Sequence, residues 1–286
     1  MWSLTKRNLY LFFSSPSTIF FSLLGALIAF VLYTVFLRDN IDSALMLKNY
    51  NLLLDPWVIG GVLTVTTITT TLTAFSQMII DRGTKTLADF LITPVAYFKI
   101  QFSYIISAIT ISIVMQFGML AIMYTYFSIT DQLRFPFEQL VPLFLLIILS
   151  SLVWTAFSQF ILSFVTRIET LGRLGTIIGT MSGFLAGVYL PSGMLPSSAQ
   201  HFINLTPAIY NAALFRNLLM KNPLNQTFNS VQTRHIFEKN MGVRININGP
   251  LTGSTMIIIL FASFLGFGLL SLLLSKRSRN FITKQI

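Results

Sequence analysis

The chain reads Asp81-Arg-Gly-Thr-Lys-Thr-Leu-Ala-Asp-Phe-Leu-Ile-Thr-Pro94 between two long apolar runs. This polar segment is about one short helix long, and no soluble domain surrounds it. A compact charged helix at a membrane surface needs a partner to receive it. The segment therefore predicts a membrane subunit that docks onto a soluble protein.

The spacing within this segment favours a helix over 81–93. Leu87, Phe90 and Leu91 recur at i, i+3 and i+4 and form one apolar face. Asp81 at the start suits the positive end of the helix dipole, and Pro94 stops the helix. An amphipathic loop lying on lipid is the alternative interpretation.

The composition requires a membrane. Of 286 residues, 54% are hydrophobic and 10% are charged, and the mean hydropathy is +0.74. Ordinary soluble domains carry roughly 25% charged residues. The lack of cysteine excludes disulfides, thiol catalysis and Cys-based metal sites. Because the basic residues lie at the ends of apolar runs, the net charge of +10 indicates membrane orientation rather than a nucleic-acid partner.

Six apolar runs are long enough to cross a bilayer as helices of about 20 residues. They are Thr18–Leu37, Trp57–Ile80, Gln101–Phe127, Leu140–Val165, Leu174–Leu190 and Ser254–Ser275. Before the first, Met1–Ser15 combines aromatic and leucine residues with Lys6 and Arg7 and predicts a helix lying on the inner leaflet. A frayed start of the first span is the alternative.

The charges of the short loops predict that both termini are cytoplasmic. With the N-terminus inside, the inner segments hold 11 basic and three acidic residues, and the outer segments hold eight and six. Most outer basic residues lie in the long loop Ser192–Gly253, and long loops follow the positive-inside rule poorly.

The spans lack the residues that ion-coupled carriers and ATP-binding or metal-dependent proteins need. No Asp, Glu, Lys or Arg lies within spans two to six as delimited, which argues against an ion-coupled carrier. No P-loop, metal constellation or Ser/His/Asp set is present, because Gly83-Thr-Lys-Thr lacks the upstream glycine of a P-loop. His201 and His235, both expected outside, are interpreted as surface residues.

Three features in order resemble the ABC-2 type permeases, the membrane subunits of type V ABC exporters. The first is the basic-aromatic start from Lys6-Arg-Asn-Leu-Tyr to Ser15-Pro16. The second is Asp81-Arg-Gly-Thr with Leu87, Leu91 and Thr93-Pro94, although the family often has Glu at the first position. The third is Tyr189-Leu-Pro-Ser-Gly-Met-Leu-Pro196, followed by Thr206-Pro207.

The resemblance implies an all-α membrane protein, a single domain over 1–286. It would have six transmembrane helices, an interfacial helix (1–16), a cytoplasmic coupling helix (81–94) and short re-entrant outer helices with an external cap (192–253). It also implies a half-transporter without enzymatic activity in a bacterial plasma membrane. A second permease subunit, the same chain or a sister chain, would pair with it. A separate ATP-binding cassette subunit would hold ATP and Mg²⁺, so the chain itself is expected to carry no cofactor.

The coupling residues are expected in the segment that comes after span two. They are Asp81, Arg82, Gly83, Thr84, Lys85, Leu87, Asp89, Phe90, Leu91 and Pro94. The loop Thr166–Arg173 is a second candidate contact, with a simple positive-inside anchor as its alternative.

Span five carries glycines every four residues, at Gly175, Gly179, Gly183 and Gly187. Overlapping G-x-x-x-G units let two helix backbones approach closely. They predict a dimer seam or a sliding contact, with static packing inside one subunit as the alternative.

Span two is rich in hydroxyls, and one of its faces carries Thr66, Thr70, Thr73 and Gln77. These side chains either line a mildly polar pathway or bond the carbonyl four residues back. In the family, spans two and five line the route. The pathway candidates are therefore this face together with Met181, Phe184 and Tyr189, near which Phe75 and Met78 also lie.

The adaptable apolar surface of Met and aromatic side chains favours an amphipathic cargo: a drug, a lipid-like molecule or a peptide. Export of a polysaccharide or teichoic-acid precursor is one alternative, and an ion-coupled carrier acting alone is another. In the outer segment, Phe202, Ile203, Ile209 and Phe215 suit re-entrant helices, and Asn222–Pro250 is expected to form a small cap.

The predicted topology can be tested because the chain has no cysteine. A single cysteine at Asn40 or Asn229 should react with an impermeant thiol reagent in whole cells, whereas one at Thr84 or Ser278 should not. Labelling of Thr84→Cys from outside would contradict the topology.

Overall fold

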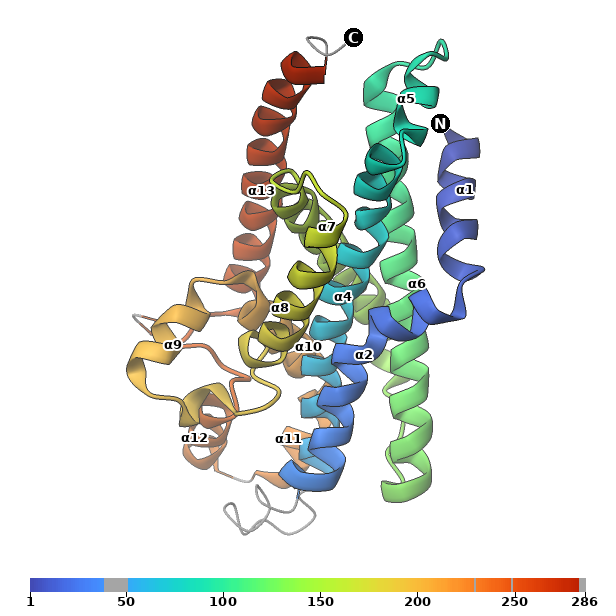
Figure 1. Ribbon diagram of the computed structural model, residues 1–286. Coiled ribbons are helices and arrows are strands. Elements are labelled where there is room, and N and C mark those ends of the chain that lie inside the picture. The colour runs from blue at the N-terminus through green and yellow to red at the C-terminus, as the bar shows by residue number, and fades with distance from the viewer. Residues whose placement is uncertain (39–50, 229, 248, 283–286) are drawn as a thin grey trace.

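The computed structural model describes residues 1–38, 51–228, 230–247 and 249–282, with the backbone alone from residue 275 onward. Asn40 and Asn229, the outer positions chosen for thiol labelling, lie outside these ranges. Within them every regular element is a helix, and an isolated bridge joins Asn246 to Pro250. The long helices run side by side, and the shorter ones gather at the two ends (Figure 1). The all-α prediction is therefore confirmed.

Five helices are long and apolar enough to cross a membrane, and they correspond to five of the six predicted spans. They are α2 with the π-helical turn η1 (Pro16–Leu37), α4 (Asn51–Gly83), α6 (Tyr97–Asp131), the 3₁₀ turn η2 with α7 (Phe137–Leu162), and α13 (Gly253–Ile282), which is apolar to Leu274. The chain is thus a multi-pass membrane protein.

The remaining predicted span, Leu174–Leu190, is not one continuous helix. Helix α8 covers Glu169–Leu185, and its 17 residues would extend about 26 Å, less than the roughly 30 Å of a hydrocarbon core. It ends because Gly187 adopts φ +62°, which turns the backbone out of the helix. Its first turns include Glu169 and Arg173, so the helix begins earlier than the hydropathy indicates.

Helix α4 is the central element of the fold. Every residue from Leu53 to Leu72 is buried, and the helix packs against α2, α6, α7, α8 and α10. Its threonine hydroxyls bond the carbonyl four residues back, as Thr66 does to Val62 and Thr70 to Thr66. The internal bonding that one interpretation expected of these hydroxyls is therefore present.

A few of these hydroxyls also join neighbouring helices. Ser150 of α7 donates to Thr67 of α4 at 3.2 Å, and Asn211 of α10 (Pro207–Leu219) donates to Ser150 at 2.8 Å. Further along, Ser158 donates to Thr71 at 3.1 Å. Side-chain bonds of this kind are each worth about 0.6–2 kcal/mol in membranes, so they align the helices without dominating the packing.

Helix α4 begins six residues before the predicted span and therefore contains an acidic residue. Asp55 is fully buried and accepts a hydrogen bond from the Tyr33 hydroxyl at 3.1 Å. Nearby, Arg38 pairs with Asp131 at the end of α6. The expectation that span two carries no ionisable group fails, because the helix continues past the apolar run.

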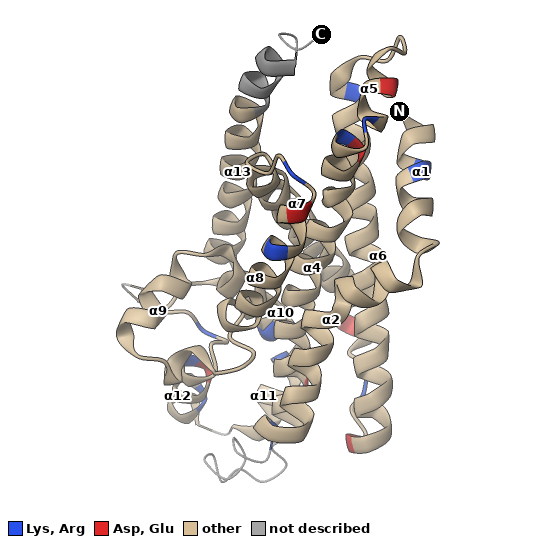
Figure 2. Ribbon diagram, in the orientation of Figure 1, with Lys and Arg blue, Asp and Glu red and all other residues tan. Residues whose placement is uncertain are grey.

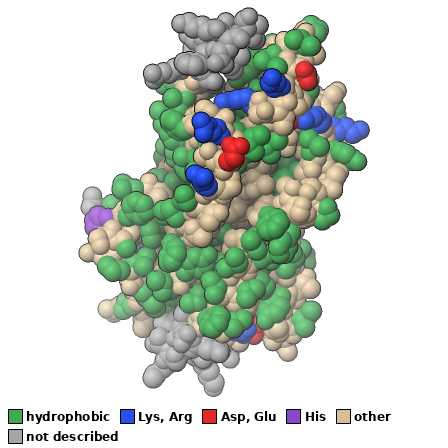
Figure 3. Space-filling model, in the orientation of Figure 1, with side chains coloured by type: hydrophobic (Ala, Val, Ile, Leu, Met, Phe, Trp, Pro, Cys, Tyr) green, Lys and Arg blue, Asp and Glu red, His purple; other side chains and the backbone are tan. Residues whose placement is uncertain are grey.

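One end of the molecule carries α1 (Trp2–Phe13), the short helix α5 (Thr86–Leu91) and the last turns of α13 (Figure 1). The Lys, Arg, Asp and Glu positions coloured in Figure 2 gather at this α5 end and near the start of α8, and others lie around α12 (Val231–Asn240). On the face shown in Figure 3, most of the charged side chains lie above a broad apolar surface. Helix α1 forms where the interfacial helix was predicted and packs against α6.

The segment Ser192–Gly253, which is expected outside, contains η3 (Ser192–Met194), α9 (Ser197–Asn204), α10, α11 (Lys221–Thr227) and α12. Helix α10 is buried and packs on α4, α7 and α13, with Ile209 and Phe215 fully enclosed. In α9, Ile203 is buried and Phe202 is exposed. The apolar residues singled out in the sequence thus lie on short helices, and re-entry of these helices into the membrane stays a prediction.

Candidate functional site

Asp81 lies at the centre of a polar cluster at the α5 end. Its carboxylate accepts two hydrogen bonds from Arg7 of α1, at 2.7 and 3.0 Å. It accepts two more, from Tyr104 of α6 at 2.5 Å and from Gln77 of α4 at 2.8 Å. The Asp81 side chain is 3% exposed, and that of Arg7 is 31% exposed. We call these four residues the Asp81 node.

The node connects α1, α4 and α6, and it reaches α5 through Arg7, whose guanidinium lies 5.3 Å from the centre of the Phe90 ring. Hydrogen bonding to Asp81 raises the pKa of Arg7, so the pair remains charged. Two-pronged Arg–carboxylate contacts fix orientation as well as distance. A displacement of α5 is therefore passed to three longer helices.

The predicted helix over 81–93 divides in two. Asp81, Arg82 and Gly83 are the last residues of α4, and the backbone breaks at Lys85, which has φ +64°. Helix α5 then runs only from Thr86 to Leu91. Asp81 thus faces inward from the end of α4 rather than capping the next helix, because Arg7 and Tyr104 bind its carboxylate.

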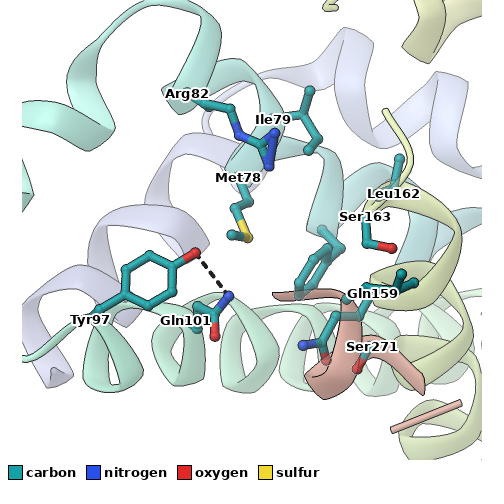
Figure 4. A pocket seen from close by; sticks show the side chains of 11 residues that line it. Met78, Ile79, Arg82, Tyr97, Gln101, Gln159, Leu162, Ser163 and Ser271 are labelled. Carbon is teal, nitrogen blue, oxygen red and sulfur yellow. Dashed lines mark hydrogen bonds between the residues drawn. The ribbon is translucent and has the colours of Figure 1, made fainter. Parts of the chain in front are cut away.

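The exposed surface of this end differs from the predicted apolar face. Leu87 is 4% exposed and packs into the protein's own core, with Phe90 and Leu91 partly buried beside it. Ile92 is 86% exposed. The other coupling candidates that face solvent are Gly83, Thr84, Lys85, Asp89 and Pro94. Arg82 is half-buried and directed between α4 and α7 (Figure 4).

The loop before α8 lies beside this surface. The side chain of Ile168 packs so closely over Gly83 that a Cβ there would come within 2.5 Å of its terminal carbon. Arg167 and Glu169 on either side are exposed. The structure thus brings Thr166–Arg173 to the end of α4, next to the break that precedes α5.

A groove runs along α8, with α2 as its other wall and α4 as its floor. Its volume is about 550 Å³. It is lined by Phe21, Leu24, Gly25 and Ile28 of α2, by Thr69, Leu72 and Thr73 of α4, and by Gly172, Gly175, Thr176, Gly179, Thr180 and Tyr189. A second hollow beyond Thr180 extends it past Phe184 toward Leu32 and Leu37. No lining residue of either hollow is charged. We call the two together the α2–α8 groove.

Only some of the predicted pathway residues lie in this groove. Thr73, Phe184 and Tyr189 line it. Thr66 and Thr70 are fully buried and do not line it, and Gln77 belongs to the Asp81 node. Met181 is 41% exposed on α8 but is not part of the lining.

The four glycines of the predicted ladder have three different environments. Gly175 and Gly179 leave open space where a side chain would begin, although the Gly179 carbonyl lies 3.4 Å from the Cβ position of Gly25 on α2. At Gly183 the Tyr189 ring occupies that space, at 2.3 Å. Gly187 lies in the turn after α8 with its positive φ. Packing within the subunit therefore accounts for Gly183 and Gly187, and an open face remains at Gly175 and Gly179.

Arg216 of α10 is a buried cation that the sequence analysis missed. It is fully enclosed, and its guanidinium lies 4.5 Å from the centre of the Trp57 ring. It donates to the carbonyls of Ala186 and Gly187 at 3.0 and 2.9 Å and to that of Trp57 at 3.2 Å. These carbonyls belong to the C-terminal end of α8 and to α4. The signal in the sequence was a single arginine in an otherwise uncharged 13-residue helix.

Replacing Arg216 with Leu should destabilise the protein by about 1–3 kcal/mol, because buried carbonyls then lose their donor. Arg216→Lys should recover part of the loss, since an ammonium reaches fewer of them. The measurement is the unfolding midpoint of the purified protein in detergent. Arg134→Leu, at an exposed arginine, is the control and should change stability by less than about 0.5 kcal/mol. Equal unfolding midpoints for Arg216→Leu and the parent would contradict the inference that Arg216 stabilises the end of α8.

Comparison with known proteins agrees with this geometry. The sequence profile of the family described as ABC-2 type transporter matches residues 1–220, which include the Asp81 node, the α2–α8 groove and α10. A search of curated proteins finds no match. The matched region covers more than three quarters of the 286 residues, and the chain therefore belongs to the ABC-2 type transporter family, as a permease component.

Proposed function

We propose that this chain is the permease half of an ATP-driven exporter in a bacterial plasma membrane, with both termini and α5 in the cytoplasm. It pairs with a second permease, and each permease docks through its α5 end onto an ATP-binding subunit. Membership of the family implies an ATP-binding partner. The observation that carries the proposal is that one helix, α4, joins the floor of the groove to the Asp81 node.

The mechanical connection follows from the geometry of α4. Thr69 and Thr73 lie on the groove floor, and Asp81 is two to three turns further along the same helix. The Asp81 node attaches this end to α1 and so to α2, the opposite wall of the groove. Closure of the ATPase dimer against α5 would then move the wall and the floor of the groove together.

The lining of the groove favours an amphipathic cargo. It carries no charge, and its polar groups are mainly threonines whose hydroxyls already donate to the backbone, as in Thr73 to Thr69 and Thr180 to Thr176. A carbohydrate polymer presents many hydroxyls that would each need a partner. A drug or lipid-like molecule places apolar surface against Phe21, Leu24 and Ile28, at little cost in unpaired polar groups.

The open face of α8 supports a second permease subunit as the missing wall. Gly175→Leu and Gly179→Leu point into open space in one subunit, so the protein should fold with near-parental stability. Transport should nevertheless fall about tenfold or more, because a packed helix interface does not accommodate a large side chain. The assay is export of a fluorescent amphipathic dye from cells that contain the ATPase.

Gly183→Leu is the matched comparison, because its new side chain collides with Tyr189 inside the same subunit. It should lower the unfolding midpoint, whereas the other two variants should not. Normal export by both Gly175→Leu and Gly179→Leu would mean that no partner covers this face.

Docking of the ATPase should depend on the exposed residues of the α5 end. Asp89→Lys combined with Ile92→Asp should weaken co-purification of the ATP-hydrolysing subunit and reduce substrate-stimulated hydrolysis. Both side chains face solvent, so the membrane fold should survive. The experiment measures vanadate-sensitive ATPase activity bound to the tagged permease.

Leu87→Ser serves as the contrasting variant, because this side chain packs into the core. It should reduce stability first, by about 2–3 kcal/mol for a buried leucine side chain. If the double variant retains its ATPase and exports like the parent, the α5 end is a surface loop without a coupling role. If the permease exports in liposomes without any ATPase, it acts alone as a carrier.

A further inference from the structure

A small pocket lies between α4, α6, α7 and α13 at the α5 end (Figure 4). Its lining joins an apolar part, which includes Phe75, Leu162 and Leu274, to a polar part with Arg82, Gln101 and Gln159. No lining residue is acidic. The pocket does not contribute to the α2–α8 groove.

Arg82 is the unusual residue of this pocket. Among the described residues it makes no hydrogen bond or ion pair, and its Nε is buried without a partner. Leaving a buried charged donor unpaired costs more than leaving a neutral one, and such groups in native proteins require an explanation. Its neighbour Asp81 cannot serve, because it is bound by Arg7, Tyr104 and Gln77.

The arrangement around Arg82 fits an anion. The side chain extends over Met78 and Ile79 toward the pocket, and the amide of Gln159 lies across from it (Figure 4). That amide supplies two N–H donors and is not bonded to a described residue. A guanidinium fork matches the oxygens of a phosphate. The pocket can thus surround a phosphate with donors on two sides.

The location indicates where such a phosphate comes from. Arg82 is next to the last residue of α4, and Tyr97 is the first residue of α6, so the pocket lies at headgroup depth. Just beyond it, α13 exposes Leu269, Leu270 and Leu273, an apolar surface on which acyl chains can lie. Basic pockets between membrane helices at this depth bind anionic lipid headgroups.

We propose that this pocket binds the phosphate of an anionic phospholipid through Arg82, with the acyl chains along α13. The bound lipid supplies the counter-charge that no described residue gives to Arg82. It also occupies the space between the end of α4 and α13. This assigns Arg82 to lipid binding rather than to the ATPase contact expected from the sequence.

The test uses the full chain, purified and stripped of lipid in detergent, then titrated with phosphatidylglycerol and observed by native mass spectrometry. Arg82→Gln should weaken binding of the most tightly held lipid roughly tenfold, the loss expected for a charged hydrogen-bonded contact. Phosphatidylcholine should bind the parent no better than it binds the variant. Lys99→Gln removes an exposed charge at the same membrane depth and should leave binding unchanged.

A second variant protects the test against misfolding. Ser271→Phe fills the pocket from α13 and leaves Arg82 in place, so it should also lose the lipid. If Arg82→Gln is unstable, the binding of phosphatidylglycerol by Ser271→Phe is the measurement that tests the proposal. The proposal is overturned if the variants bind phosphatidylglycerol like the parent, or if Lys99→Gln loses as much affinity as Arg82→Gln. It is also overturned if inorganic phosphate displaces the lipid at equal concentration, since the ligand would then be a free anion.

Discussion

The burial of α4 on every side is the constraint on which the rest of the structure depends. A 33-residue helix enclosed by five others cannot direct polar groups to water, so its threonines return their hydroxyls to its own backbone. The helix then behaves as a stiff rod, whose two ends carry the polar contacts that position it. At one end Asp81 is bound by Arg7, and at the other Trp57 lies beneath Arg216.

Arg7 and Arg216 find hydrogen-bond acceptors of different kinds. Arg7 meets a carboxylate and stays partly exposed, so its contact can reorganise when α5 is displaced. Arg216 meets only carbonyls and an aromatic ring and is fully enclosed. Removing it would leave those carbonyls inside a low-dielectric environment, where unpaired groups are costly. Arg216 therefore fixes the C-terminal end of α8, whereas the partly exposed Arg7 contact at the α5 end is the less enclosed of the two.

Hydropathy predicts much of this fold, and sequence reasoning fails where side chains meet across helices. Five spans, the helix at the N-terminus and the short outer helices are all marked by apolar runs and prolines. The end of α8 is not, because the turn at Gly187 lies inside an apolar run and is stabilised by Arg216, 29 residues away. The position of Asp81 before a polar helical segment likewise predicted that it begins a helix. Its four hydrogen bonds, three of them from α1 and α6, could not be read from neighbouring residues.

The groove shows why hydroxyl spacing alone does not identify the residues that line a hollow. Thr66, Thr70, Thr73 and Gln77 share one face of an isolated helix, but five packed helices divide that face among them. The part left open is set by where α2 and α8 separate, on either side of the close contact between Gly25 and Gly179. The Cβ position of Gly25 meets the Gly179 carbonyl at 3.4 Å, an ordinary contact distance, and the Cβ position of Gly179 is open. The uncharged groove therefore follows from how α2 and α8 pack on α4, which the spacing of hydroxyls along α4 alone does not show.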